Sequence, residues 1–385
     1  MAPTAGSGSA PRVLHVMECT IGGTRRHLVD VAQGLLERGI DLHLAVAVER
    51  APDFRADLER LARRGCGVHE LAMVRELSPG RDARHLLALE RLLARLAPDV
   101  VHTHSSKAGV LGRLASLATG IGRRVHTPHS MAFLFREMFG PLRRHLFFQL
   151  ERHLAAQTDQ VIAVSAGEAA TLRAAGVVDG ARLAVVPNGI DPAPFAGAAP
   201  IDLAALGLDP ARPTAAVVGL LNVAKGQDLA LEAAALCPTL QLLVVGEGGT
   251  RAELEDLARR LGIAARVRFL GFRRDVPAIL AAADLALLPS RWEGLPYAAL
   301  EAMAAARPVL ATPVDGARDV IEHGLDGWLA ADVSAAALAR SLAAALALSP
   351  AERRAAGERG RERVRQRFTR AKMVEGLLAV YAELV

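Results

Sequence analysis

Short apolar runs alternate with amphipathic segments along the first half of the chain. The run Arg12 to Met17 is followed by Thr24 to Arg38, in which apolar residues recur at helical spacing until Gly39. Continuous apolar strands that alternate with helices are typical of a parallel sheet covered on both faces. The same pattern predicts further strands at residues 42–48, 67–71, 99–103, 124–127, 160–164 and 183–186, and further helices at 53–64, 81–96 and 107–119.

The alternation stops at Pro187-Asn-Gly-Ile-Asp-Pro-Ala-Pro194 and starts again after residue 200. Gly and Pro at this density mark a loop, so residues 191–200 are the predicted linker. Later segments predict strands at 215–218, 240–245, 267–270, 285–288 and 308–311, and helices at 227–236, 250–261, 296–306, 317–322, 335–348, 351–368 and 370–384. We therefore expect two doubly wound α/β domains, residues 12–190 and 201–369, in which ligands bind at the carboxyl ends of the strands.

The composition supports two globular domains and excludes several classes of protein. The chain has 385 residues, of which 51% are hydrophobic and 23% charged. Its three cysteines are far apart and form no C-x-x-C motif, which argues against a disulfide framework and against a zinc site. Residues 1–11 are small and polar and are expected to be a flexible tail. No apolar run is long enough to span a membrane, so we expect a cytoplasmic protein.

The formal net charge of +5 falls in the first half of the chain, while the second half is neutral. This asymmetry suggests an anionic partner for the first domain. No zinc finger, RNP-type motif or helix-turn-helix accompanies the charge, which argues against nucleic acid. Residues 131–154 contain half of the phenylalanines, interleaved with arginines. Two interpretations stay open: a segment at the interface with anionic lipid, or aromatic side chains packed against the sheet.

The stretch Pro289 to Ala306 carries an unusual carboxylate. Pro296 is the expected first residue of a helix, because its missing N–H would be unpaired there anyway. From Tyr297 to Ala306 only Glu301 can ionise, so the helix is expected to be buried on every face. A buried carboxylate needs hydrogen-bond donors.

A second carboxylate, Glu293, comes just before this helix, beside the backbone N–H groups of Gly294 and Leu295. Two carboxylates with free backbone donors between them suit a polyhydroxylated, anionic ligand. The structural alternative is a capped core helix in which Glu301 forms a salt bridge.

Four other turns between strand and helix are candidates for ligand binding, and they carry Gly22 and Gly23, Lys225, Gly246 and Gly248, and His129. Gly22 and Gly23 follow the first strand, and two glycines before a helix allow a phosphate to approach the backbone. Lys225 stands at the start of a helix, where its charge would complement a phosphate. A tight turn and a solvated lysine are the structural alternatives.

Gly246 and Gly248 follow a strand and could lie close to a nucleotide. Thr250 and Glu253 behind them form a predicted capping box. Position 251 is Arg where a dinucleotide fingerprint has Gly, and the chain has no G-x-G-x-x-G with an acidic ribose reader. Both points argue against a nicotinamide-dependent oxidoreductase.

Histidines gather at the predicted strand ends of the first domain. His129 is expected on the loop after residues 124–127, and His102 and His104 on the loop one strand earlier. A single loop histidine is more often a surface residue than a catalyst. The clustering makes His129 a candidate for the site.

Glu293 and Glu301 lie within Pro289-Ser-Arg-Trp-Glu-Gly-Leu-Pro-Tyr-Ala-Ala-Leu-Glu-Ala-Met303, which resembles the signature of family 4 retaining glycosyltransferases of the GT-B fold. Similar short motifs follow in order over nearly the whole chain. They are Gly22-Gly23, His126-Thr-Pro-His129, Val164-Ser165, Pro187-Asn-Gly-Ile-Asp191, Lys225-Gly226, Gly246-Glu-Gly248, Leu270-Gly271, Ala283-Asp284 and Asp315-Gly316. The sequence is similar to members that build bacterial exopolysaccharide, capsule, O-antigen or lipopolysaccharide.

The resemblance implies two Rossmann-like domains that face each other across a cleft, with the helix at 370–385 crossing back onto the first domain. It implies that Glu301 binds the ribose of a nucleotide sugar, that Glu293 binds the hydroxyl groups of the donor sugar, and that Lys225 clamps the diphosphate leaving group. The remaining implied contacts are backbone N–H groups around Gly294, Leu295 and Pro296 beside Glu293, Gly22 and Gly23 at the diphosphate, Gly246 and Gly248 at the nucleotide, and His129 at the donor sugar near the reacting carbon.

The implied reaction transfers a hexose-type sugar with retention, by front-face attack, and needs no metal and no cofactor besides the nucleotide sugar. We expect a UDP-linked donor and a polyprenyl-linked or polysaccharide acceptor at the inner membrane face, with peripheral contact to anionic lipid.

One departure from the family pattern concerns the phosphate. The family usually has Arg directly after Gly219, and this chain has Leu220. The loss of one charged hydrogen bond is worth roughly 1.5–3 kcal/mol. Arg25 or Arg26 could replace it. The alternative is a protein that binds a donor but transfers slowly, acting as a scaffold of a polysaccharide assembly complex.

Overall fold

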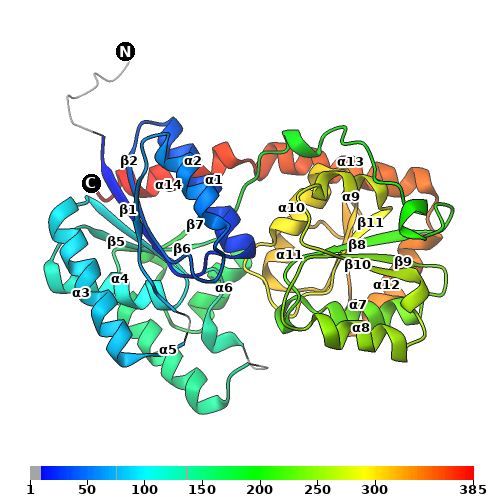
Figure 1. The fold of residues 1–385 in the computed structure, drawn as a ribbon, viewed down its shortest axis with the longest axis horizontal. Helices are drawn as coiled ribbons and strands as arrows, with labels where there is room; N and C mark the ends of the chain where they lie inside the picture. The colour runs from blue at the N-terminus through cyan, green and yellow to red at the C-terminus, as the bar shows by residue number, and fades with distance from the viewer. Residues whose placement is uncertain (1–9, 75, 136–137) are drawn as a thin grey trace. The chain divides into compact units, whose positions relative to one another are not determined.

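The computed structural model describes residues 10–74, 76–135 and 138–385, and most of the predicted tail at 1–11 lies outside these ranges. The chain folds into two compact units, each built around its own parallel sheet (Figure 1). Unit 1 comprises residues up to 163 together with 169–186 and 374–385. Unit 2 comprises residues 164–168 and 187–373.

The sheet of unit 1 has the strand order β3-β2-β1-β4-β5-β6-β7, with every pair parallel. Its strands are β1 (Arg12–Met17), β2 (Asp41–Val46), β3 (Gly67–Glu70), β4 (Val100–His104), β5 (Arg123–Thr127), β6 (Gln160–Ala163) and β7 (Leu183–Val185). The order reverses between β1 and β4. Such a reversal is where ligands bind in doubly wound sheets.

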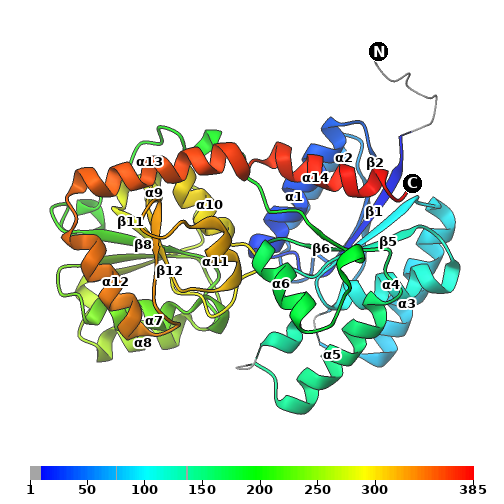
Figure 2. The ribbon, with the colours of Figure 1, turned by 180° about the vertical axis from the view of Figure 1, so that it is seen from behind.

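Helices cover this sheet, and they form where apolar residues recur at helical spacing. They are α1 (Gly22–Glu37), α2 (Phe54–Ala62), α3 (Pro79–Leu96), α4 (Lys107–Thr119), α5 (Pro141–Ala155), α6 (Ala166–Ala174) and the last turns of α14 (Arg370–Ala382). Helix α14 packs on α1, since a Cβ added to Gly34 would lie 2.3 Å from Val374 (Figure 2).

The sheet of unit 2 has the order β10-β9-β8-β11-β12-β13, again all parallel, and reverses between β8 and β11. Its strands are β8 (Thr214–Val218), β9 (Gln241–Val245), β10 (Val267–Gly271), β11 (Leu285–Leu288), β12 (Val309–Ala311) and β13 (Gly327–Leu329). Its helices are α7 (Gln227–Ala235), α8 (Arg251–Arg260), α9 (Val276–Ala282), α10 (Tyr297–Ala304), α11 (Asp315–Val320), α12 (Ala335–Ala347) and α13 (Pro350–Arg367).

The prediction of two doubly wound α/β sheets is therefore confirmed, and the pattern missed only some elements. Strand β13 is three residues long and lies at the sheet edge, where it is defined by its pairing with β12 rather than by a long apolar run. Helices α5 and α6 lie in segments for which no helix was predicted. No helix in the described ranges is both long enough and apolar enough to cross a membrane.

A buried ion pair joins helices α4 and α5 in unit 1. Arg113 is fully buried, and its two terminal nitrogens lie 2.7 Å and 3.0 Å from the carboxylate oxygens of Glu151. His126 on β5 lies beside them, 3.7 Å from the same carboxylate. Burial, together with the charge of Arg113, lowers the pKa of His126 to about 3.

The depressed pKa of His126 predicts that acid weakens unit 1. Above pH 6.5 this imidazole is neutral in both the folded and the unfolded chain. Between pH 6.5 and about 3 only the unfolded chain binds the proton, so the free energy of unfolding falls as the pH falls. Between pH 7 and pH 5, the free energy of unfolding of His126→Gln should therefore fall by roughly 2 kcal/mol less than that of wild type. Denaturant unfolding at the two pH values measures this difference.

The matched control is His153→Gln, which removes an exposed histidine from α5. It should keep the pH dependence of the wild-type protein. Equal pH dependence in His126→Gln and wild type would contradict the assignment.

Candidate functional site

Lys225 ends the short turn that follows strand β8. The turn is a 3-10 helix, Val223–Lys225, capped by Asn222, whose side-chain oxygen accepts a hydrogen bond of 3.2 Å from the backbone N–H of Lys225. Gln227 at the start of α7 donates to the carbonyl of Leu220 at 2.9 Å. These two local bonds fix where the lysine side chain begins.

The structure brings Lys225 together with Glu293, two residues that the sequence singled out separately. The lysine Nζ lies 2.6 Å and 2.9 Å from the two carboxylate oxygens of Glu293. Ser290 also donates to this carboxylate, at 2.7 Å. The glutamate side chain is 11% exposed and the lysine 30%, so the pair is partly shielded from water. Both residues follow neighbouring strands, β8 and β11, at the reversal of the sheet.

A small pocket opens beside this pair, at the carboxyl ends of β8 and β11. Its polar lining comes from Lys225, Gln227, Ser290 and Glu293. A wider hollow in unit 1 lies near the end of α5, between Arg152 and Arg182, and contains none of the predicted site residues. The pocket in unit 2 is the candidate site, because it is lined by an ion pair and a hydroxyl group that can bind a polar ligand.

Gly246 and Gly248 lie in the loop after β9, directly against the loop that follows β8. A Cβ at Gly246 would lie 2.0 Å from the carbonyl oxygen of Gly219, and one at Gly248 would lie 2.0 Å from that of Leu221. Packing between two loops therefore requires glycine at both positions, whatever ligand they contact. The capping box predicted beyond them is wrong, because the side chain of Thr250 makes no capping hydrogen bond to α8.

Gly294, Leu295 and Pro296 lead from the Glu293 loop into α10. The side-chain amide of Asn188 donates to the carbonyl of Leu295 at 2.9 Å, and Gly316 packs against the carbonyl of Gly294. Pro296 caps α10 in an extended conformation, so the expectation that it is the first helical residue is wrong by one position.

Glu301 lies on α10, one turn after Tyr297. It is half-buried, and the expected complete burial of this carboxylate is therefore wrong. The apolar residues around it, among them Ala299, Leu300 and Met303, are fully buried. The helix thus turns its apolar positions into the core and leaves the carboxylate at the margin.

In unit 1, Gly22 and Gly23 begin helix α1, and the side chain of its N-cap residue, Ile21, makes no capping hydrogen bond. The arginines that follow them are already paired. Arg25 lies 2.7 Å from Asp53 and 2.6 Å from Asp57, and Arg26 lies 2.6 Å from a carboxylate oxygen of Asp30. This pairing weighs against either arginine as a substitute phosphate clamp.

His129 is held by a second histidine. Its Nε2 lies 3.1 Å from Nδ1 of His104. Its backbone has a positive φ of 54°, a conformation that costs energy for residues other than glycine. His102 and His104 were expected on a loop, but both lie within strand β4 and are completely buried. Burial lowers the pKa of His129, and the nearby His27 and His126 lower it further.

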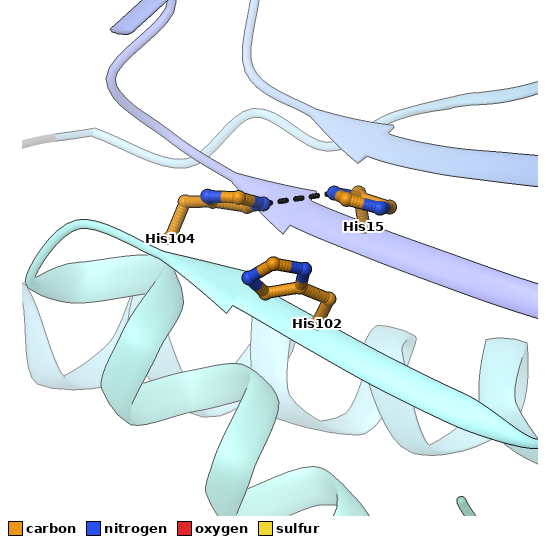
Figure 3. A group of neighbouring side chains, drawn as sticks. All are labelled: His15, His102 and His104. Atoms are coloured by element: carbon orange, nitrogen blue, oxygen red, sulfur yellow. Dashed lines mark hydrogen bonds between the residues drawn. The ribbon is translucent and has the colours of Figure 1, made fainter. Parts of the chain in front are cut away.

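Sequence reasoning missed the buried partners of these histidines. His15 on β1 lies 2.8 Å from His104 (Figure 3), and His27 on α1 faces His129 with ring centroids 4.5 Å apart. Ring nitrogens within each of the triads His15-His102-His104 and His27-His104-His129 lie within 4.8 Å of one another. The available signal was a polar residue inside an apolar strand, at His15 and again at His102 and His104.

Each half of the chain matches a different profile of a known protein family. The "Glycosyltransferase Family 4" profile matches residues 21–194, and the "Glycosyl transferases group 1" profile matches residues 200–363. The UDP-Gal:alpha-D-GlcNAc-diphosphoundecaprenol alpha-1,3-galactosyltransferase of Escherichia coli is 32% identical over 267 residues, which are 67% of this chain and 68% of that protein.

Solved structures show the same fold. Sucrose-phosphate synthase from Thermosynechococcus elongatus has a TM-score of 0.82 at 22% identity, over 97% of this chain and 99% of that one. HepE of Anabaena, in complex with UDP-glucose, has a TM-score of 0.78 at 22% identity, over 97% and 100%. With two Rossmann-like sheets of the GT-B fold and matches in both halves, the chain belongs to the group 1 and family 4 glycosyltransferases.

Proposed function

We propose that this glycosyltransferase moves a sugar from a UDP-linked donor to a lipid-linked or saccharide acceptor, with retention and without a metal ion. The observation that carries the proposal is the ion pair of Lys225 and Glu293 at the reversal of the unit 2 sheet. A cation beside a carboxylate offers one group for a diphosphate and another for the hydroxyl groups of a sugar.

The charges of Lys225 and Glu293 determine their proposed roles. Lys225 donates to the diphosphate and stabilises it as it leaves. Glu293, fixed by Ser290, accepts hydrogen bonds from hydroxyl groups of the donor sugar, assisted by backbone N–H groups at Gly294 and Leu295. In this proposal Glu301 at the margin of α10 binds the ribose.

Unit 1 supplies the remaining contacts in the proposal. Gly22 and Gly23, at the start of α1, contact the diphosphate through backbone N–H groups. His129 contacts the donor sugar near its reacting carbon. The acceptor oxygen then bonds to that carbon on the face from which the phosphate departs, and the leaving phosphate oxygen takes the proton of the acceptor hydroxyl.

The donor and acceptor classes rest on what related proteins use. The relative from E. coli is named for UDP-Gal and for a diphosphoundecaprenol-linked acceptor, and HepE was solved with UDP-glucose. Transfer of these properties to this chain is our proposal. It agrees with a basic first half, which suits an anionic lipid diphosphate.

Helix α5 offers a surface for peripheral contact with a membrane. Leu142 and Leu146 are 83% and 60% exposed, one turn apart, and Leu150 continues their stripe. Arg143, also exposed, lies beside them. Of the two interpretations left open for the phenylalanines of residues 131–154, packing holds for Phe133 and Phe148: Phe133 is buried, and the two rings meet edge to face at 5.4 Å. Leucines and arginine, not aromatic side chains, therefore make the proposed membrane surface.

A second candidate function, a donor-binding scaffold with slow transfer, is favoured by Leu220. This residue follows Gly219 where the family pattern has a second cation, and Arg25 and Arg26 are paired with carboxylates elsewhere. The two candidates share a donor site and differ in rate.

Two substitutions should separate the roles of the ion pair. Lys225→Met should weaken binding of UDP itself and lower kcat/KM about 10- to 100-fold, the loss of one charged hydrogen bond. Glu293→Gln should weaken binding of UDP-glucose or UDP-galactose but leave UDP binding near wild type. Isothermal titration and UDP-release assays measure both, and circular dichroism checks folding.

Lys372→Met serves as the control, since Lys372 is an exposed lysine on α14. It should match wild type in every assay. Wild-type turnover in Lys225→Met would contradict the proposed site.

Leu220→Arg tests the second candidate directly. If the missing cation limits transfer, the substitution should raise kcat/KM by roughly tenfold or more, because a charged hydrogen bond to phosphate is worth about 1.5–3 kcal/mol. Leu220→Met is the uncharged control and should not change the rate. An unchanged rate in Leu220→Arg would show that the wild-type clamp is already sufficient.

The membrane surface can be tested with vesicles that contain anionic lipid. Leu142→Glu combined with Leu146→Glu should reduce co-sedimentation by roughly tenfold or more, because two exposed leucines can no longer enter the interface. The control combines Leu77→Glu with Leu236→Glu, two leucines that are 77% and 64% exposed elsewhere. Equal loss in both double variants would contradict a specific role for α5.

A further inference from the structure

Six side chains of unit 1 form one unbroken chain of hydrogen bonds, which we call the imidazole chain. Its members come from β1, β4, β5, the loop after β5 and helix α14. In order, the bonds are Thr127 Oγ1 to His102 Nε2 (2.8 Å), His102 Nδ1 to Tyr381 OH (2.6 Å), Tyr381 OH to His15 Nε2 (3.2 Å), His15 Nδ1 to His104 Nε2 (2.8 Å), and His104 Nδ1 to His129 Nε2 (3.1 Å). Figure 3 shows the rings of His15, His102 and His104, with the bond between His15 and His104.

The imidazole chain is closed to solvent along nearly its whole length. Thr127, His15, His102, His104 and Tyr381 are all at most 1% exposed. Only the last member, His129, is half-buried. Water therefore cannot satisfy a ring nitrogen that loses its partner within the chain, and a mismatch there leaves a buried polar atom unpaired.

Burial also fixes the protonation of His15, His102, His104 and Tyr381. It lowers the pKa of His15 to about 3 and lowers those of His102 and His104 well below the usual range, so the rings are neutral at pH 7. Burial raises the pKa of Tyr381, so its phenol keeps the proton. Each neutral imidazole has one N–H donor and one acceptor nitrogen.

Because each neutral ring donates from only one nitrogen, the tautomer of one histidine in the imidazole chain fixes the tautomers of the others. If Tyr381 donates to His15, then His15 donates from Nδ1 to His104, and His104 donates from Nδ1 to His129. His129 then carries its own proton on Nδ1. If Tyr381 instead donates to His102, every bond reverses, and His129 carries its proton on Nε2 and presents Nδ1 as an acceptor.

We propose that Tyr381 is a positioning residue for His129: through the imidazole chain, this phenol on the last helix sets whether Nδ1 of His129 faces a ligand as a donor or as an acceptor. The consequence for catalysis rests on the proposed function, in which His129 contacts the donor sugar. The coupling itself does not depend on that function.

The same histidines could be considered as a metal site, because the triads lie within 4.8 Å. The hydrogen bonds argue against this for the central triad. All six ring nitrogens of His15, His102 and His104 are already engaged, with one another or with Tyr381, Thr127 and His129. A bound ion would have to break several of these buried bonds.

The test is Tyr381→Phe in the full chain, which removes one oxygen and keeps the ring. Selective 15N labelling of histidine reports the protonated nitrogen of each ring by NMR. In wild type we expect one tautomer for each of His15, His104 and His129, all pointing the same way along the chain. In Tyr381→Phe we expect His129 to lose its single tautomer, and kcat to fall about 10- to 100-fold with little change in the KM of the donor.

Two controls separate this effect from general damage. Tyr297→Phe removes the other tyrosine of the chain, whose hydroxyl contacts the sulfur of Met373, and should leave the histidine signals unchanged. His69→Gln breaks a different histidine pair, the 3.2 Å contact with His43, and should leave kcat unchanged.

An unchanged His129 tautomer in Tyr381→Phe would overturn the proposal, and a changed tautomer with unchanged kcat would overturn its consequence for catalysis. Uptake of one equivalent of Zn²⁺ by wild type, with simultaneous shifts of His15, His102 and His104, would also overturn it. If Tyr381→Phe does not fold, wild type alone decides, since rings that point in opposite directions along the chain contradict the coupling. If no sugar transfer is found at all, the proposed function fails, and the tautomer measurement still tests the imidazole chain.

Discussion

The parallel pairing of neighbouring strands is the constraint on which the candidate site depends. Strands β8 and β11 lie side by side at the reversal of the unit 2 sheet, so the loops at their carboxyl ends must diverge from a common point. That point brings Lys225 and Glu293, 68 positions apart in sequence, into a 2.6 Å contact. Gly246 and Gly248 let the neighbouring loop pack closely against the first. The strand order of the sheet thus brings the two charged residues together, and the loops that carry them set how closely their side chains approach.

The same constraint explains what the sequence could predict. Apolar runs separated by helical segments were enough for both sheets, because strands buried on both faces must be continuously apolar. Lys225 and Glu293 were found because charged residues after such strands stand out. Their mutual pairing was not predicted, since it depends on which strands are neighbours, and strand order is not written in any local pattern.

Details that depend on packing were also beyond the sequence. The burial of Glu301 was overestimated because helix α10 turns this one position toward the margin of the core. His102 and His104 were predicted on the loop after the strand but lie within β4, because a polar imidazole is typical of a loop unless its buried partners are known. His15 and Tyr381, far apart in sequence, complete the buried group through a hydrogen bond of 3.2 Å. Such long-range partners are visible only in the fold.

The proposed site for a nucleotide sugar is the carboxyl end of the unit 2 sheet, with Lys225 on the diphosphate and Glu293 on the sugar. The decisive measurement is isothermal titration of the wild-type chain with UDP-glucose, UDP-galactose, GDP-mannose and ADP-glucose. We predict one-to-one binding of a UDP-sugar that is tighter than the binding of the other two nucleotide sugars. Absence of binding for all four, by a folded protein, would contradict the proposed nucleotide-sugar site.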